Sequence, residues 1–142
     1  MRVLIDTNIL LDFLLQREPF FQDAERLFRV IKSNQITGYA TATTLTDIFY
    51  IARKHTSSIE QARQAVSETM TAMEICSVDR RILETALSSG SADFEDAVQI
   101  ACAVVQRLDA ILTRDTQGFL NSSVPVLSVV SCLQQLEESD SE

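Results

Sequence analysis

The sequence predicts an α/β fold, a three-layer α/β/α sandwich around a central parallel sheet of five strands. Short apolar runs alternate along the chain with longer segments whose apolar residues recur at helical spacing. Glycine (3) and proline (2) are scarce, which indicates helices joined by short connections. The 142 residues, 46% of them hydrophobic, suit a single domain, which we expect over residues 1–136, before an acidic disordered tail at 137–142.

The first four elements follow from apolar runs and helical periodicity. Residues 2–5 (RVLI) form a short apolar run that predicts a buried strand, and residues 8–15 follow as a short helix. A proline at the start of residues 19–33 suits the first turn of a second helix, whose apolar residues recur three and four apart. Residues 36–40 (ITGYA) predict the next strand.

The middle of the chain predicts a helical pair, a strand and a further helix. From Thr44 onward, Leu45, Ile48 and Ala52 form one apolar stripe, and residues 59–73 form another amphipathic helix. The next residues, EICSV, predict a strand at 74–78, and the helical pattern after them predicts a helix at 79–87.

The last third begins with SSGSA, the clearest loop signal in the chain. The segment after it, 93–108, is apolar on nearly every side beyond its first turn, as expected for a deeply packed helix. Two more apolar runs predict strands at 109–113 and 124–128, and a final helix is expected at 129–138.

Charge and reactive side chains exclude several classes of protein. The three cysteines are far apart in apolar surroundings, so we expect buried, reduced packing residues. The single histidine, His55, argues against a zinc site or a catalytic triad. A net charge of −8 disfavours nonspecific nucleic-acid binding, although four of the acids lie in the last six residues. The first residues lack the basic, apolar and small-residue progression of a secretory signal, and no apolar stretch approaches the length that spans a membrane, so we expect a cytoplasmic protein.

Asp6 poses the main chemical question, because it stands directly after the first strand, where an unpaired buried carboxylate would be costly. Other acids are expected near the same sheet edge, where ligands of parallel α/β sheets collect. They are Asp47, Asp93, Asp96 and Asp115. Taken singly, each has a plain explanation: Asp6 and Asp93 as helix caps, Asp115 as a turn residue and Asp47 as a solvated helical acid.

Together, these acids would repel one another unless they shared a cation. Carboxylate oxygens are the ligands that Mg²⁺ and Mn²⁺ prefer, and such ions keep open positions for substrate phosphate. The acids therefore indicate phosphodiester hydrolysis with Mg²⁺ or Mn²⁺ as cofactor.

Four features follow one another along essentially the whole chain: IDTNILLD at 5–12, the acid Asp47, DFEDAVQIACA at 93–103 and ILTRDTQGF at 111–119. In this order they resemble the PIN domain family, whose small bacterial members include the VapC-type toxins. The resemblance implies a metal-dependent endoribonuclease, in which acids hold Mg²⁺ or Mn²⁺ while water cleaves RNA to leave a 5′ phosphate and a 3′ hydroxyl.

The resemblance also assigns roles by position. Asp6, Asp96 and Asp115 match the first, third and fourth metal-binding acids, and Asp93 is an added candidate ligand. Asp47 stands at the second catalytic position, where glutamate is more usual. Two polar residues match positions that shape the family's site, and a basic residue beside the fourth acid is the candidate for binding RNA: Asn8, Thr113 and Arg114.

The resemblance bears on the partners of the chain, and the residues bear on the alternative functions. The resemblance implies a single-stranded RNA substrate, an antitoxin protein as partner and a homodimer. Phe20, Phe21 and Phe28 would serve an interface or, as we favour, the core. A phosphoacceptor receiver domain or a haloacid-dehalogenase-type phosphatase fits poorly, because no lysine follows Lys54 and Asn8 replaces the second acid of the phosphatase. The stronger alternative is a catalytically weak or inactive PIN-like module that binds protein or RNA.

Overall fold

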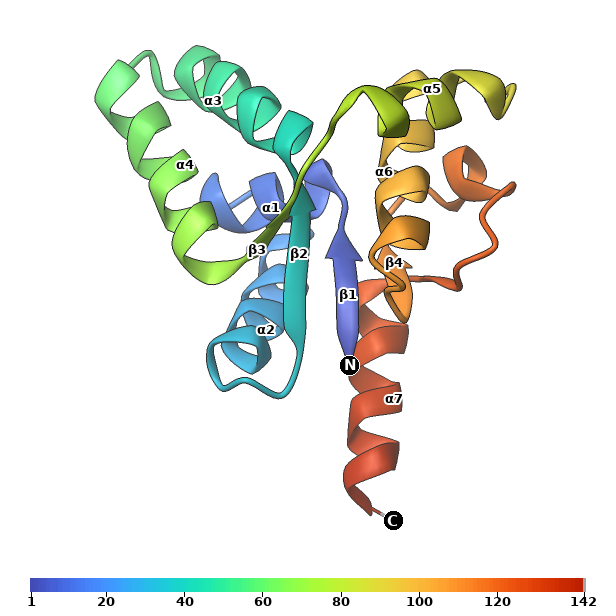
Figure 1. Cartoon of the computed structure of the whole chain (residues 1–142). Coiled ribbons are helices and arrows are strands. Elements are labelled where there is room, and N and C mark those ends of the chain that lie inside the picture. The colour runs from blue at the N-terminus through green and yellow to red at the C-terminus, as the bar shows by residue number, and fades with distance from the viewer. Residues whose placement is uncertain (142) are drawn as a thin grey trace.

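The computed structural model describes residues 1–141 and has a five-stranded sheet at its centre (Figure 1). All strand pairs are parallel, in the order β3-β2-β1-β4-β5. The strands are β1 (Arg2–Ile5), β2 (Thr37–Thr41), β3 (Glu74–Cys76), β4 (Ala110–Leu112) and β5 (Val126–Leu127). Each overlaps an apolar run from which a strand was predicted, and β2 ends one residue beyond its run, so the predicted α/β fold is confirmed.

Helices cover both faces of the sheet. One buried core joins the sheet to α1 (Thr7–Leu14), α2 (Phe21–Lys32), α3 (Ala42–Thr56), α4 (Ile59–Ala72) and α7 (Val129–Ser141). A second core joins the opposite face to α5 (Arg80–Ser88), α6 (Phe94–Val105) and the 3₁₀ turn η1 (Thr116–Phe119). These are the three layers expected from the sequence.

The central strand shows how the sequence builds both cores. Successive side chains of a strand point to opposite faces, and in β1 Val3 and Ile5 lie in the first core while Leu4 lies in the second. The neighbouring strand β4 repeats this alternation, since Leu4 pairs with Ile111 in the parallel register and Ile5 with Leu112. The residue that follows, Asp6, thus lies on the same face as Leu4, the face covered by α6.

Two helices begin two residues away from their expected starts. The helix expected to open at Pro19 begins at Phe21, because Pro19 lies in the preceding turn. The helix expected from Thr44 begins at Ala42, because the side chain of Thr41 caps it by accepting a hydrogen bond from the amide of Thr44 (3.1 Å).

The acidic end of the chain also differs. The structure continues α7 through Ser141, so residues 137–141, for which we expected disorder, are helical. The expectation for Glu142 lies outside the described residues.

Most of the cysteine and phenylalanine side chains discussed above pack in the interior. The three cysteines are free and buried, as predicted. Phe28 is buried and stacks on Phe13, with ring centroids 3.8 Å apart, whereas Phe20 is 38% exposed. Within residues 1–141, no helix is both long and apolar enough to cross a membrane.

A candidate metal-binding acid cluster

The carboxylate of Asp6 is buried at the end of β1 and is held by two neutral donors. Its Oδ1 accepts a hydrogen bond from Nε2 of Gln99 in α6 (3.1 Å), and its Oδ2 accepts one from Oγ1 of Thr113 after β4 (2.8 Å). Asp6 occupies the N-cap position of α1, but its side chain makes no capping hydrogen bond. The helix-cap explanation therefore does not account for this carboxylate.

The first turn of α6 brings more carboxylates toward Asp6. Asp93 caps this helix, its Oδ1 accepting a hydrogen bond from the amide of Asp96 (3.0 Å). The pKa of Asp96 is raised to about 7, first by burial and then by the negative charges of Asp93, Asp6 and Asp115. Acids from three separated segments thus act on one carboxyl group.

Glu95, the residue before Asp96, links the cluster to α3. Its pKa is raised to about 7, first by a hydrogen bond with the side chain of Asp47, then by burial and by the charges of Asp47, Asp6 and Asp93. Thr7 also donates a hydrogen bond to its Oε1 (3.4 Å). A carboxyl pair that shares a hydrogen bond must hold a proton or meet a cation.

Asp115 and a glycine close the cluster from the side of η1. Oδ1 of Asp115 accepts a hydrogen bond from the amide of Gln117 (3.2 Å), so Asp115 is also the turn residue that its sequence context suggested. A Cβ atom at Gly118 would overlap Oδ2 of Asp96 and would lie 3.8 Å from Oδ2 of Asp115. The absent side chain leaves the space that these two carboxylates face.

The donor chemistry of this acid cluster suits a hard divalent cation. Its charged groups are carboxylates, whose oxygens are the ligands that Mg²⁺ and Mn²⁺ prefer. A hydrogen bond raises the pKa of Glu95 and burial raises that of Asp96, and neighbouring negative charges act in the same direction on both. Across residues 1–141, no three His, Cys, Asp or Glu side chains are grouped closely enough to hold a metal ion. The cluster therefore supplies suitable donors without forming a complete coordination shell.

The predicted site residues separate into two groups in the structure. The acid cluster brings together the five predicted acids and Thr113: Asp6, Asp47, Asp93, Asp96, Asp115 and Thr113. Asn8 and Arg114 make other contacts. The Oδ1 and backbone carbonyl of Asn8 accept hydrogen bonds from Arg17 (3.3 and 2.9 Å), and Arg114 contacts Asp12.

Asp12 is a second buried carboxylate, only 1% exposed, and two arginines neutralise it. Arg17 donates from Nε to Oδ1 (3.0 Å), and Arg114 donates from Nε to Oδ2 (2.8 Å) and from Nη2 to Oδ1 (3.3 Å). The guanidinium carbon of Arg114 also lies 3.7 Å from the ring centroid of Phe20, a close cation–π contact. We call these four residues the arginine clamp.

Sequence reasoning did not select Glu95 and Gln99 for the acid cluster or Asp12 and Arg17 for the arginine clamp. Gln99 carried a usable signal, because it is the single polar residue in the apolar run from Ala97 to Val105. Glu95 lies between two selected acids in DFED, but its approach to Asp47 depends on how α3 and α6 meet. The pairing of Asp12 with Arg114, 102 positions apart, has no local signal.

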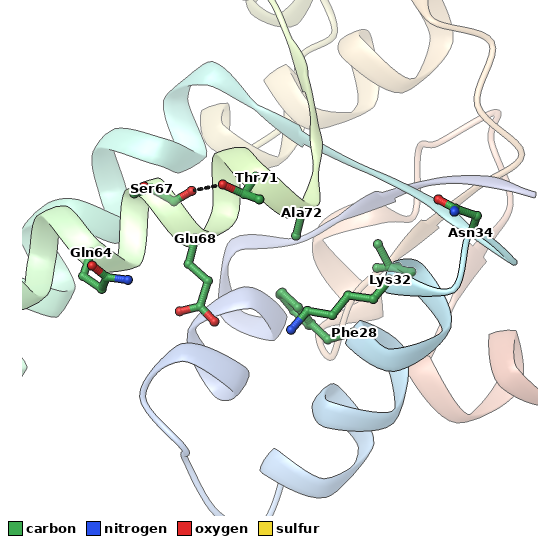
Figure 2. A pocket seen from close by; sticks show the side chains of 9 residues that line it. Phe28, Lys32, Asn34, Gln64, Ser67, Glu68, Thr71 and Ala72 are labelled. Carbon is green, nitrogen blue, oxygen red and sulfur yellow. Dashed lines mark hydrogen bonds between the residues drawn. The ribbon is translucent and has the colours of Figure 1, made fainter.

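Two cavities of about 560 Å³ each lie away from the acid cluster. One of them lies between α2 and α4, and Figure 2 shows Lys32 and Glu68 among its lining side chains. Thr71 in its wall donates a hydrogen bond to the carbonyl of Ser67 (3.0 Å). With one acid and one base, this cavity lacks the converging carboxylates found at the sheet edge.

Comparison with known families gives one match that spans most of the chain. The family model described as PIN domain matches residues 2–117, a segment that contains every residue of the acid cluster. No curated protein sequence matches the chain significantly.

Solved structures with a similar fold include several toxins. The DNA-bound VapBC of Salmonella typhimurium has a TM-score of 0.69 and 15% identity, over 91% of this chain and 98% of the other. VapC20 of Mycobacterium tuberculosis, a toxin that cleaves the sarcin–ricin loop, has a TM-score of 0.68 and 13% identity, over 84% of this chain and 94% of the other. A toxin–antitoxin complex of Klebsiella pneumoniae has a TM-score of 0.65 and 22% identity, over 89% of this chain and 97% of the other. At these identities, the likeness concerns the fold.

Proposed function

The chain belongs to the PIN domain family, and from that premise we propose that it is an endoribonuclease that hydrolyses RNA phosphodiester bonds with Mg²⁺ or Mn²⁺. The observation that carries this proposal is the convergence of acids from β1, α3, α6 and η1 on one sheet edge, where their charges raise the pKa of Glu95 and Asp96. A protein without a cation to bind has no evident reason to keep this repulsion.

We assign the cation to oxygen atoms of Asp6, Asp96 and Asp115, with Asp93 as an added ligand and Asp47 acting with Glu95 at its edge. A divalent ion bound there would activate water and neutralise charge on the phosphoryl group. Asp47 is one methylene shorter than the usual glutamate of the family, and its hydrogen bond with Glu95 supports a role for Glu95 in extending the reach of that position.

The chain's own neutral groups orient the cluster. Gln99 and Thr113 each hold one oxygen of Asp6, so they fix the plane of its carboxylate without neutralising its charge. In the proposed reaction, the oxygen of water forms a bond to phosphorus and the bond from phosphorus to the 3′ oxygen breaks. The 3′ oxygen takes up a proton, which leaves a 3′ hydroxyl and a 5′ phosphate.

Single-stranded RNA is the proposed substrate, since its backbone can enter an open sheet edge and its bases are free of pairing. We propose a toxin role with an antitoxin partner and a homodimer in the cytoplasm. The structures of toxin–antitoxin complexes with the same fold support the partner. Four exposed apolar side chains on α3 and α4 supply a surface for protein contact: Tyr50, Ile51, Ile59 and Met70.

Cleavage of a labelled single-stranded RNA in Mn²⁺, in Mg²⁺ and in EDTA tests the proposed activity. We expect metal-dependent cleavage by the wild type and a loss of at least a hundredfold in Asp6→Asn and in Asp96→Asn. Asp140→Asn is the matched control, because this exposed carboxylate lies near the end of α7. If the folded wild type does not cleave, or if all variants cleave equally, the proposal fails and the non-catalytic binding module is preferred.

A further inference from the structure

A smaller cavity, of about 260 Å³, lies directly beside the acid cluster. Its lining surface is mostly apolar, and five apolar side chains from α1, from α2 and its N-cap, and from α7 contribute to it: Ile9, Phe20, Ala24, Val129 and Val130. Asp12, Asp23, Thr113, Arg114, Thr116 and Ser128 add polar groups. An apolar hollow with a few polar groups is the usual form of a small-ligand site.

Both carboxylates that line this cavity, those of Asp12 and Asp23, are paired with arginine side chains. Arg17 and Arg114 face the single carboxylate of Asp12, which leaves one positive charge uncompensated in the arginine clamp. Asp23, which also lines the cavity, is paired with Arg26 (3.9 Å). In a chain with a net charge of −8, such a site next to the acid cluster favours an anionic group as ligand.

The aromatic and guanidinium groups of this cavity suit a nucleobase. Phe20 is 38% exposed although it stacks on Arg114, so its ring stays accessible to a ligand. Proteins bind unpaired RNA bases by stacking them on aromatic rings or on arginine planes. Asp12 keeps the guanidinium of Arg114 in place from its buried side through two hydrogen bonds.

Thr113 connects the cavity to the acid cluster. It lines the cavity, and its hydroxyl donates to Oδ2 of Asp6 (2.8 Å). Thr116, also in the wall, follows Asp115 directly and begins η1. A nucleotide in the cavity would therefore be a close neighbour of a phosphate held at the acids.

We propose that this cavity receives the base of an RNA nucleotide next to the cleaved phosphate, while Arg114 binds a neighbouring backbone phosphate. This inference rests on the proposed function and adds to it the subsite that selects the sequence. The volume of the cavity accommodates one base, so the cavity would recognise one nucleotide. Asp12 is the residue that positions Arg114.

Binding without cleavage tests the subsite separately from catalysis. We would use the full chain with Asp96→Asn, in EDTA, and measure the affinity for labelled RNA hexamers of each base and for an abasic hexamer of equal charge. At least one base-containing hexamer should bind about tenfold tighter than the abasic one, as expected for one stacked base. Equal affinity for all hexamers would overturn the proposal.

Two changes in the cavity locate the effect. Val130→Met enlarges a side chain in its wall, and Phe20→Leu removes the aromatic ring while keeping apolar bulk. Each should bring the ratio between base-containing and abasic RNA close to one without changing the affinity for abasic RNA. Val105→Met is the matched control, since Val105 is an exposed valine at the end of α6. Unchanged discrimination in both cavity variants would contradict the assignment.

The role of Arg114 has a different signature. Arg114→Gln should weaken binding of every hexamer, the abasic one included, and should lower the slope of log affinity against log salt by about 0.7, the value for one lost phosphate contact on a single strand. An unchanged salt slope would remove Arg114 from the proposal. If the wild type cleaves RNA but shows no base discrimination, the subsite alone fails; if it does not cleave, the proposed activity fails whatever the hexamers show.

Discussion

Asp6 and Asp12 are both buried carboxylates in the same short stretch of chain, but their surroundings are opposite. Asp6 accepts hydrogen bonds from the neutral groups of Gln99 and Thr113 and has other acids nearby. Asp12 is neutralised by Arg17 and Arg114. The difference teaches that burial alone does not identify a reactive carboxylate: Asp6 retains charge for a ligand, whereas Asp12 uses its charge to hold the protein's own side chains.

The two carboxylates should differ in their contribution to stability when no cation is bound. Asp12→Asn leaves two guanidinium groups without their shared partner. Breaking a buried pair costs about 3–5 kcal/mol, and because the arginine side chains are 30% and 34% exposed, we expect about 2 kcal/mol after solvent screening. Asp6→Asn removes repulsion as well as one hydrogen bond, so it should stay within about 1 kcal/mol of the wild type in EDTA. Urea unfolding measures both.

Glu84→Gln calibrates this comparison. Its exposed pair with Arg80 in α5 (2.7 Å) should contribute no more than about 0.5 kcal/mol. If Asp6→Asn destabilised the chain as much as Asp12→Asn, Asp6 would be a structural residue and the contrast between the two carboxylates would be lost.

A divalent cation should separate the two carboxylates next. Mn²⁺ at a hundred times its dissociation constant would stabilise the wild type by about 2.7 kcal/mol through binding to the folded state, read as a rise in Tm. Asp6→Asn should lose most of this rise, and Asp12→Asn should keep it from a lower starting Tm. A rise of equal size in both variants would place the cation elsewhere.

The last prediction compares alanine substitutions at two glycines. Gly118→Ala places a methyl group against Asp96, so we expect RNA cleavage to fall about tenfold, the cost of a small misplacement of a ligand. Gly90→Ala meets no atom within 4 Å but has a φ of +71°, so it should lose about 1–2 kcal/mol of stability with cleavage intact. Cleavage and urea unfolding of both variants test this; the reverse pattern would show that Gly118 serves only the backbone.

Much of the fold was predictable because its signals are local. All five strands overlap the expected apolar runs, and the rule that ligands collect at the carboxyl ends of parallel strands selected Asp6 and Asp115 from the sequence. The family resemblance added the order of the acids. What could not be predicted depends on how distant helices meet: the carboxyl pair of Glu95 and Asp47, and the arginine clamp, are products of packing.

The structure places Pro19 and Asn8 in surroundings that their local sequence did not indicate. Pro19 was expected within the first turn of α2, but it belongs to the turn before Phe21. Asn8, which the family resemblance matched to a position that shapes the site, lies in the first turn of α1. Its side chain accepts from Arg17 instead.

The pairing of β1 with β4 gives the acid cluster one more property. The register that sets Leu4 beside Ile111 and Ile5 beside Leu112 places Asp6 beside Thr113 as the next step, where their side chains hydrogen-bond. A slip of one residue would turn the apolar side chains of β1 to the wrong faces and separate Asp6 from its hydroxyl donor at once. The same register therefore sets both the packing of the sheet and the geometry of the acid cluster. A rise in Tm on adding a divalent cation would then report that the sheet has formed in the correct register.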